Sequence, residues 1–535
     1  MNVVWSIAGT DSSGGAGLAA DQRAIDAFPD THFCGVVAAV TAQNSRAVTQ
    51  VAPMPVALID TQLQALADDM PADALKTGLL CDAGQMRSVA AWTRRLRERR
   101  PGLPLVVDPV LGASSGATFA DDAAVQAYRT HLLPLATLIT PNRREAARLL
   151  GRPALRREEL PEAAEALRAL GPEAVCITGG DPADAGADEQ SLALDWLDSP
   201  HARGWLALPR LGSGNTHATG CTFASSAAAA LARGFVAADA AVLAKMAATH
   251  ALRHGHAAGR GPGQVLARPG FHADPALLPC LSFGDQPVFA PERAAPGGAP
   301  GLYAIVDSAA RVQAVLAAGV RTVQLRIKQP AGADAGWYRQ LEEAVRAASA
   351  ACRTAGARLF VNDHWQLAMA CGAHGVHLGQ SDLQALAEDE RAALATSGLA
   401  LGVSSHSLWE LARARGLAPA YIACGPVWPT LTKAMPWRPQ GLDNLRWWVA
   451  MAGAPVVAIG GILEPRQITQ AAEAGADGVC VVRMLGAQPG ETVPAMQEAL
   501  ARAVPRPQPD RASLGWPRPS LPVPWSARPL EAAAG

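Results

Sequence analysis

The second half of the chain repeats one pattern, in which a short apolar segment is followed by a stretch with helical spacing. The stretches 337–355 and 465–474, for example, carry Ala, Leu, Glu and Arg at that spacing. Eight strands alternating with helices in roughly 200 residues predict a closed (β/α)8 TIM barrel, with a doubly wound sheet as the alternative. The predicted strands are 302–306, 322–327, 358–361, 375–378, 400–403, 421–423, 456–459 and 478–482.

The first half also alternates apolar segments with helical stretches, but it carries more irregular polar segments. Two of its apolar segments, 192–197 and 205–208, lie close together, which favours antiparallel pairing. The pattern therefore predicts an α/β sandwich with some antiparallel strands and not a second barrel. The other predicted strands are 3–8, 35–40, 105–107, 137–140 and 174–178.

Two proline-rich stretches interrupt this alternation. Residues 269–300 and residues 505–535 contain too many prolines for a helix or an interior strand. We therefore predict a first domain at 1–268, a linker at 269–300, a second domain at 301–504 and a tail at 505–535.

Charge and cysteine content exclude several classes of protein. The 46 basic residues balance 47 acidic residues, so no basic excess indicates nucleic-acid binding. The nine cysteines form no CxxC motif, which is typical of a reduced, cytoplasmic protein without zinc ribbons. No signal peptide or membrane-spanning apolar run is recognisable, so we expect a cytoplasmic location and no membrane partner.

Lysine is scarce among the basic residues. Only Lys76, Lys245, Lys328 and Lys433 are lysines, and the remaining basic residues are arginine. We interpret this as compositional bias that replaces lysine wherever arginine serves equally well. The four remaining lysines then indicate positions where a compact ammonium group is needed.

Polar residues follow the apolar segments of the predicted barrel, where functional groups collect in this fold. Strand alternation predicts that Gln324, Arg326 and Lys328 point to one side of the strand. Two cations that point into the barrel mouth are costly unless an anion neutralises them. Asp363 and Asp382 follow the next two strands. Two carboxylates opposite two cations are suited to Mg²⁺ held partly by substrate phosphate oxygens.

The later strands end in groups that suit phosphate. The fifth strand ends at Ser404, the seventh at Gly460 and Gly461, and the eighth at Arg483. A hydroxyl-rich loop, 425–433, follows the sixth strand and closes on a lysine. Loops after the seventh and eighth strands are the usual phosphate site of TIM barrels.

The ordered motifs QLRIK, VNDHWQLA, GVHLGQSD, LGVSSHS, GPVWPTLTK and AIGGI resemble thiamine-phosphate synthase over nearly all of 301–504. The resemblance implies coupling of 4-amino-2-methyl-5-(diphosphooxymethyl)pyrimidine to a thiazole phosphate carboxylate, with release of pyrophosphate and CO₂. It also implies that Asp363 and Asp382 bind Mg²⁺. The implied pyrimidine diphosphate ligands are Gln324, Arg326, Lys328, Asn362, Ser404 and Lys433, and the implied thiazole phosphate ligands are Thr430, Thr432 and Gly461.

One position departs from that family. The family usually has a small serine near the end of the eighth strand, where this chain has Val482 and Arg483. Arg483 either supplies a bidentate phosphate contact or points away, and the sequence leaves both readings open. We keep both residues among the predicted substrate-binding positions.

Two segments of the first half suit a phosphorylated ligand. A glycine-rich loop follows the first strand at 9–17, although it lacks the GK[ST] signature of a P-loop. The polar turn 215–222 precedes an alanine-rich helical stretch, so its N–H groups and helix dipole favour an anion. Cys221 lies in the first turn, where we expect a lowered pKa and a role as nucleophile or base, with a buried structural cysteine as the alternative.

The motifs IAGTDSSGGAG, TAQNS, KTGLL, VVDPV, ITPNRREA and NTHATGCT resemble hydroxymethylpyrimidine (phosphate) kinase of the ribokinase-like superfamily over about 2–268. The resemblance implies ATP as phosphoryl donor, and it allows a homodimer formed through the kinase domain. It implies that Gly9, Asp21 and Gln43 hold the aminopyrimidine, and that Asp108 and Glu145 organise Mg²⁺ and the ATP phosphates. The implied anion hole is Ala218, Thr219 and Gly220, with Cys221 in place of the superfamily's usual aspartate base.

Two departures concern this kinase site. Ala218 replaces the family's first glycine, which leaves the N–H groups usable provided that its φ is negative. Thr178 stands where the family usually has a lysine on phosphate, so a charge is missing. We therefore expect a slower kinase, or one confined to one of its two phosphorylations.

The sequence predicts a bifunctional enzyme of thiamine biosynthesis. Its first domain would phosphorylate hydroxymethylpyrimidine and then the monophosphate, and its second domain would consume the diphosphate. One alternative is an active synthase joined to a degenerate, pyrimidine-binding first domain, which the loss of charge at Thr178 favours. Another is a pyridoxal-type kinase joined to the barrel.

Overall fold

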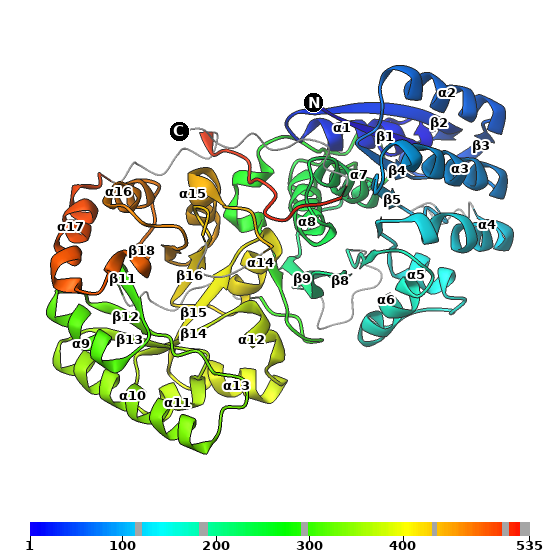
Figure 1. Ribbon diagram of the computed structural model, residues 1–535. Coiled ribbons are helices and arrows are strands. Elements are labelled where there is room, and N and C mark those ends of the chain that lie inside the picture. The colour runs from blue at the N-terminus through cyan, green and yellow to red at the C-terminus, as the bar shows by residue number, and fades with distance from the viewer. Residues whose placement is uncertain (113–119, 181–190, 290–297, 431–435, 505–512, 525–535) are drawn as a thin grey trace. The chain divides into compact units, whose positions relative to one another are not determined.

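The structure is a computed structural model that describes residues 1–112, 120–180, 191–289, 298–430, 436–504 and 513–524. The chain divides into two compact units (Figure 1). The first unit comprises Met1–Phe289 with the residues from Leu521 onwards, and the second comprises Ala290–Ser520. Among the described residues, no helix is both long and apolar enough to cross a membrane.

In the described part of the first unit, ten strands form one sheet in the order β10-β9-β8-β7-β6-β5-β4-β1-β2-β3. The six strands from β7 to β2 are parallel, and antiparallel strands extend both edges. The parallel strands therefore end at one common edge of the sheet. The strands are β1 (Asn2–Asp11), β2 (Thr31–Gln43), β3 (Val48–Pro53), β4 (Ala74–Thr77), β5 (Leu105–Val107), β6 (Leu138–Ile139), β7 (Ala174–Ile177), β8 (Leu192–Asp198), β9 (Arg203–Pro209) and β10 (Cys280–Leu281).

Helices connect these strands and cover the sheet (Figure 1). The pair α7 and α8 is rich in alanine, and its small side chains are almost all buried, so the two helices pack closely. This pair carries the polar turn that the sequence places before an anion-binding helix. The helices are α1 (Gly17–Asp26), α2 (Val56–Asp69), α3 (Ala83–Arg99), α4 (Asp122–Ala127), α5 (Arg143–Leu149), α6 (Leu160–Arg168), α7 (Thr219–Ala232) and α8 (Ala237–Arg253).

The described residues of the second unit form a closed parallel barrel in the order β11 to β18. Aromatic side chains of Tyr303, Phe360 and Tyr421 fill its interior. The strands are β11 (Gly301–Val306), β12 (Thr322–Leu325), β13 (Arg358–Asn362), β14 (Gly375–Leu378), β15 (Ala400–Ser405), β16 (Tyr421–Cys424), β17 (Val456–Ala458) and β18 (Gly478–Val481). The helices are α9 (Ala309–Ala317), α10 (Ala335–Thr354), α11 (Trp365–Ala370), α12 (Gln380–Ala385), α13 (Glu388–Thr396), α14 (Leu408–Gly416), α15 (Gly441–Met451), α16 (Pro465–Glu473) and α17 (Pro489–Arg502).

The predicted fold class is confirmed for both units, and all eight barrel strands occur where the apolar segments predict them. Three of the barrel strands, β12, β17 and β18, end earlier than expected, and the end of β12 bears on the predicted site. The strand β12 ends at Leu325, so the alternation argument covers Gln324 but does not extend to Arg326 and Lys328. Beyond that strand Arg326 is half-buried and Lys328 is exposed.

The proline-rich segments also hold more structure than their composition suggests. The strand β10, which lies inside the predicted linker, pairs with β9 of the first unit. In the predicted tail, the backbone N–H of Arg518 donates to Oδ1 of Asn444 on α15, at 2.7 Å. Proline prevents long regular elements, but short strands and single hydrogen bonds survive.

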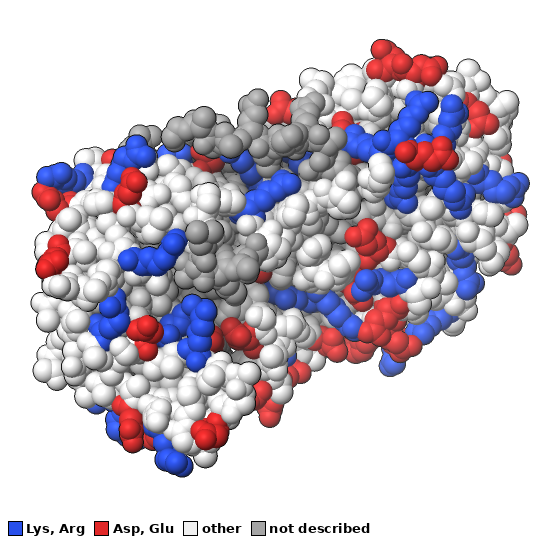
Figure 2. Space-filling view, in the orientation of Figure 1, with Lys and Arg blue, Asp and Glu red and all other residues white. Residues whose placement is uncertain are grey.

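Basic and acidic side chains lie interspersed on the face drawn in Figure 2. This distribution agrees with the formal net charge of -1.

Candidate active sites

The turn between β1 and α1 is built around the carboxylate of Asp11. Its Oδ1 accepts the backbone N–H and the hydroxyl of Ser13, and its Oδ2 accepts the backbone N–H of Ala16. These bonds fold the glycine-rich loop over the end of β1, so the loop's shape comes from one buried side chain.

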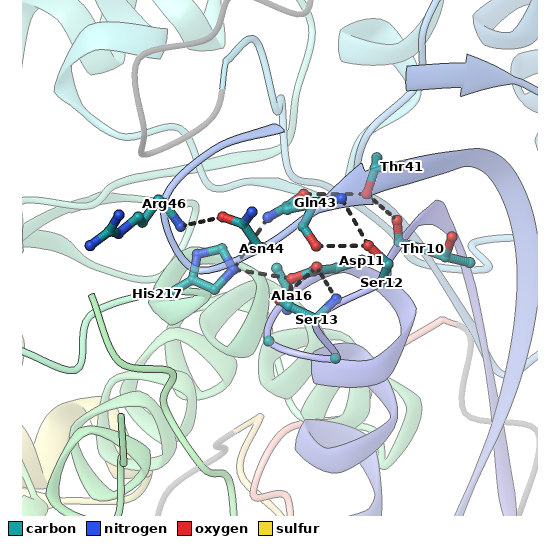
Figure 3. Close-up of polar contacts among 12 residues, drawn as sticks. Thr10, Asp11, Ser12, Ser13, Ala16, Thr41, Gln43, Asn44, Arg46 and His217 are labelled. Atoms are coloured by element: carbon teal, nitrogen blue, oxygen red, sulfur yellow. Dashed lines mark hydrogen bonds and ion pairs between the residues drawn. The ribbon is translucent and has the colours of Figure 1, made fainter. Parts of the chain in front are cut away.

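His217 reaches this turn from the segment before α7. Its Nε2 lies 3.1 Å from Oδ2 of Asp11 and 3.4 Å from Nε2 of Gln43, which ends β2 (Figure 3). Ser12 joins the same cluster, because its hydroxyl donates to the carbonyl of Gln43 and accepts the Gln43 N–H. The structure thus brings Gln43 together with two residues, Asp11 and His217, that sequence reasoning did not single out.

Burial alone would raise the pKa of Asp11, but the hydrogen bonds from His217, Ser13 and Ala16 outweigh it. The pKa of Asp11 is therefore lowered to about 2. Asp11 is thus ionised across the physiological range and holds His217 and the loop in place.

Asp21 lies behind this cluster and has no exposed surface. Its two oxygens accept from Lys76, at 2.9 and 3.0 Å, and from the hydroxyls of Ser6 and Ser225. This differs from the expected contact with the pyrimidine, because both oxygens are already engaged inside the protein. Asp21 instead positions Lys76, whose pKa is raised although burial alone would lower it, because the carboxylates of Asp21 and Asp108 face it.

A second polar cluster lies at the ends of β4, β5 and β6. Oδ2 of Asp108 is 3.9 Å from Nζ of Lys76 and has no hydrogen-bond partner, and the buried hydroxyls of Thr77 and Thr140 also lack one. Burial raises the pKa of Asp108 and of Glu145, and the Asp108 charge raises that of Glu145 further. Buried oxygens without partners and costly negative charge are relieved by a cation.

These residues fit Mg²⁺ only with help from a ligand. Among the described residues, no group of three or more His, Cys, Asp or Glu side chains could hold a metal alone. Glu145 also has a structural role, since its Oε2 accepts the N–H of Asn142 and completes the capping box of α5. Phosphate oxygens and water would therefore complete a Mg²⁺ shell here.

The N-terminus of α7 differs from expectation at two residues. Ala218 is the N-cap of the helix and has φ of +71°, which is a strained left-handed conformation for alanine. The negative φ that we required for replacing the family's glycine is therefore not met. The expected lowering of the Cys221 pKa is also wrong. Burial raises the pKa of Cys221 to about 12. Lys76 and the Gly17 N–H act against this rise, and the charges of Asp108 and Asp21 act in the same direction as burial. Cys221 is therefore a neutral thiol near Asp108.

The residues before α7 line a cavity of about 440 Å³, together with Leu252 and Arg253 of α8. Thr219 and Gly220 at the start of α7 are partly or fully exposed. Thr178 lies at the end of β7, where its backbone N–H donates to the carbonyl of Pro141 at 2.9 Å. The cavity wall comprises Leu211, Gly212, Ser213, Gly214, Asn215, Leu252 and Arg253.

In the barrel, a chain of hydrogen bonds links Gln324 to Ser404. Nε2 of Gln324 donates to the hydroxyl of Tyr303, which lies 2.7 Å from the hydroxyl of Tyr421. Nδ1 of His377 lies 2.8 Å from that second hydroxyl, and its Nε2 lies 2.9 Å from Oγ of Ser404. Two predicted diphosphate ligands, on β12 and β15, are therefore positioned by three interior side chains.

Burial, together with the charges of Arg326 and His406, lowers the pKa of His377 to about 4. His377 is therefore neutral, so one ring nitrogen donates and the other accepts. A neutral ring can orient the Ser404 hydroxyl without adding a charge to the barrel interior.

Asp363 and Asp382 follow neighbouring strands, β13 and β14. Asp363 is exposed and has φ of +68°, while Oδ2 of Asp382 accepts the N–H of Gly379 and caps α12. Asn362, at 8 % exposure, ends β13 beside them. This donor set of carboxylates and an amide fits Mg²⁺, again with phosphate oxygens and water as the remaining ligands.

The turn after β17 packs against the loop after β16. Gly461 has φ of +72°, and a Cβ there would lie 2.6 Å from the carbonyl oxygen of Trp428, so only glycine fits. This approach brings Gly461 beside Pro429, which precedes the half-buried Thr430. Thr432 and Lys433 lie outside the described residues.

The end of β18 leaves Val482 half-buried and Arg483 exposed in a short 3-10 turn. The structure therefore places Arg483 at the surface of the second unit. Both of the alternatives that the sequence left open for this side chain remain compatible with that place.

The two units therefore define a two-domain enzyme, in which a kinase of the ribokinase-like fold is joined to a TIM barrel. Residues 11–266 match the phosphomethylpyrimidine kinase family, and residues 302–485 match the thiamine monophosphate synthase family. The chain belongs to the family of bifunctional thiamine biosynthetic enzymes, with a hydroxymethylpyrimidine and phosphomethylpyrimidine kinase domain and a thiamine-phosphate synthase domain.

Similarity to two relatives extends over both units. The chain is 35% identical over 473 residues to a probable thiamine biosynthetic bifunctional enzyme of Oryza sativa subsp. japonica, covering 86% of this chain and 81% of the relative. It is 34% identical over 477 residues to the thiamine biosynthetic bifunctional enzyme of Arabidopsis thaliana, covering 86% and 84%. The ADP complex of Bacillus subtilis pyridoxal kinase is 30% identical, with 50% of this chain and 97% of that chain covered and a TM-score of 0.45.

Proposed function

We propose that the first unit transfers the γ-phosphoryl group of ATP to hydroxymethylpyrimidine and then to its monophosphate. The second unit couples the resulting diphosphate to the thiazole phosphate carboxylate and releases pyrophosphate and CO₂. The observation that carries this proposal is the continuous similarity of both units to bifunctional relatives, over 86% of this chain.

In the kinase unit, Gly9 and Gln43 bind the aminopyrimidine, with Asp11 and His217 holding the Gln43 amide in place. Asp21 acts indirectly, because its oxygens are engaged with Lys76. The exposed backbone of Thr219 and Gly220 receives the transferred phosphate at the positive end of the α7 dipole. Ala218 shapes this turn, and Cys221 lies in its first turn beside Asp108.

Asp108 and Glu145 would hold Mg²⁺ together with ATP oxygens. Mg²⁺ bound there supplies positive charge that offsets the charge building up on the transferred phosphoryl group. Lys76 keeps Asp108 in place from 3.9 Å, and the cavity before α7 receives the nucleotide. The protein's own contribution is positioning and charge stabilisation.

In the synthase unit, Gln324, Arg326, Lys328, Asn362, Ser404 and Lys433 bind the pyrimidine diphosphate, and Asp363 and Asp382 would hold Mg²⁺. Mg²⁺ held there would supply positive charge to the leaving pyrophosphate. The electron-rich pyrimidine carries the methylene cation that remains, and the thiazole nitrogen captures it. Thr430, Thr432 and Gly461 bind the thiazole phosphate, with Val482 and Arg483 at the edge of that site.

Two further features complete the proposal. All nine cysteines are free thiols, which suits a reducing cytoplasm. The partners are the small-molecule substrates, and a second copy of the chain would associate through the kinase unit.

The test measures ATP consumption with the pyrimidine alcohol and, separately, with its monophosphate. We expect turnover of both by the wild-type chain and loss of both in Asp108→Asn, which removes a carboxylate that would hold Mg²⁺. Turnover of neither substrate by the wild type would refute the kinase activity.

A further inference from the structure

Lys245 of α8 forms a buried ion pair with Asp195 of β8. Nζ of Lys245 lies 2.8 Å from Oδ2 of Asp195 and donates to the carbonyl of Ala193 at 3.1 Å. The two side chains are only 6 % and 5 % exposed. A buried pair of this kind contributes little net stability, because desolvating both charges offsets their attraction. Only four lysines occur in this chain, and one of them forms this buried pair. The pair therefore indicates a role other than stabilising the fold.

The second oxygen of Asp195 holds the turn that follows β7. Oδ1 accepts the backbone N–H of Gly179 at 3.0 Å. A Cβ on Gly179 would lie 2.2 Å from the carbonyl oxygen of Leu194, so the turn is pressed directly against β8. Lys245 fixes the Asp195 carboxylate, and this carboxylate fixes Gly179.

The same turn is linked to the segment that leads into the cavity proposed for the nucleotide, and also to the segment that carries Glu145. The carbonyl of Gly180 accepts from Nη1 of Arg210 at 3.1 Å, and Arg210 precedes the cavity wall that begins at Leu211. Thr178 forms a bridge with Asn142, the N-cap of the helix that carries Glu145. The turn 178–180 therefore lies at the carboxyl end of a parallel strand, where α/β sheets bind ligands.

We propose that Lys245 and Asp195 are positioning residues for ATP, which they align by fixing the turn 178–180 through the Gly179 N–H. This inference rests on the proposed kinase function. The turn offers phosphate only neutral donors, the Thr178 hydroxyl and the Gly180 backbone N–H, because the N–H groups of Thr178 and Gly179 already donate within the protein. The strength of such donors depends on their alignment. A buried charge pair behind the turn supplies that alignment without entering the cavity.

Two matched double variants of the full chain test the proposal. Lys245→Met/Asp195→Leu removes both charges and the acceptor for Gly179, whereas Lys245→Met/Asp195→Asn removes both charges but keeps an acceptor. We expect the KM for ATP to rise about tenfold in the first and less than about threefold in the second. The KM for the pyrimidine alcohol should stay within about twofold in both, because Gln43 and Asp11 lie on other strands.

Arg168→Met/Asp198→Asn is the control for a merely structural effect. It removes the ion pair at the other end of β8, where Arg168 and Asp198 lie 2.9 Å apart. It should lower the melting temperature and leave the KM for ATP unchanged. A KM for ATP that is the same in the two test variants, or that rises equally in the control, would overturn the proposal.

Gly179→Ala provides an independent test should the leucine variant not fold. Its added Cβ displaces the turn directly, so we expect the same selective rise in the KM for ATP, and an unchanged value contradicts the role of the turn. Absence of turnover in the wild type would refute the kinase function itself. Normal wild-type turnover with an unchanged KM for ATP in the variants would refute only this inference.

Discussion

Nε2 of His217 lies 3.1 Å from Oδ2 of Asp11, although 206 residues separate them along the chain. Asp11 ends β1, and His217 lies just before α7, so the contact joins the two motifs that flank the kinase site (Figure 3). The pair orders the glycine-rich loop and the wall of the site before any substrate binds.

Asp11→Asn should make the first unit less stable at neutral pH, by about 2 kcal/mol. The carboxyl has a pKa of about 2 in the folded protein, below its usual value in an unfolded chain. Its contribution to stability is therefore present above about pH 4 and is lost as the pH falls towards 2. Calorimetry of the full chain should show the difference in melting temperature between wild type and variant narrowing over that range.

Asp26→Asn is the matched control, because Asp26 is an exposed residue of the adjacent helix α1. Its melting temperature should follow that of the wild type at each pH. If Asp11→Asn also followed the wild type throughout, the stabilising role of the Asp11 hydrogen bonds would be wrong.

Ala218→Gly should stabilise the first unit by about 1 kcal/mol. Ala218 has φ of +71°, a conformation that costs an alanine about 1–2 kcal/mol and costs glycine almost nothing. Because the backbone at the N-terminus of α7 is unchanged, the KM for the pyrimidine should stay the same. Urea denaturation checks the prediction, and an unchanged or lower midpoint would contradict the strain at this residue.

Tyr421→Phe should weaken the synthase and leave the kinase unaffected. The lost hydroxyl contacts both Tyr303 and His377, so its removal breaks the chain between Gln324 and Ser404. We expect a several-fold higher KM for the pyrimidine diphosphate and a loss of about 1–3 kcal/mol in stability. Steady-state kinetics with the purified diphosphate measure the effect, with Tyr338→Phe as an exposed control.

Asp363→Ala should abolish Mg²⁺-dependent coupling without unfolding the barrel. The side chain is exposed, and alanine costs about 1–2 kcal/mol in its left-handed conformation, which a stable barrel tolerates. Asp363→Asn keeps the shape and removes the charge, and it should restore folding stability but not activity. Coupling at the wild-type rate in both variants would exclude Asp363 as a Mg²⁺ ligand.

The barrel strands could be predicted because each is a short apolar segment between turns, and all eight occur as expected. The strands β3 and β4 of the first unit could not. The strand β3 is largely exposed at the sheet edge and ends in a proline. The strand β4 contains Lys76, whose charge is compatible with burial only because Asp21 faces it. Such compensation comes from tertiary contacts, which a local pattern does not contain.

For the candidate sites too, the sequence predicts the motifs but not the tertiary contacts between them. The motifs contain Asp11 and His217, but their contact depends on the sheet order that brings β1 beside the segment before α7. Cys221 shows how a local rule fails, since a helix N-terminus lowers a thiol pKa only if burial and nearby carboxylates do not outweigh it. The positive φ of Ala218 likewise follows from the cap geometry and not from the residue type.

The central claim is that one chain carries both activities in sequence. The most direct measurement follows thiamine phosphate formation from ATP, Mg²⁺, thiazole phosphate carboxylate and either the pyrimidine alcohol or its diphosphate. Wild type should form product from both, Asp108→Asn only from the diphosphate, and Asp363→Ala from neither. Product from the diphosphate but none from the alcohol in the wild type would contradict the claim.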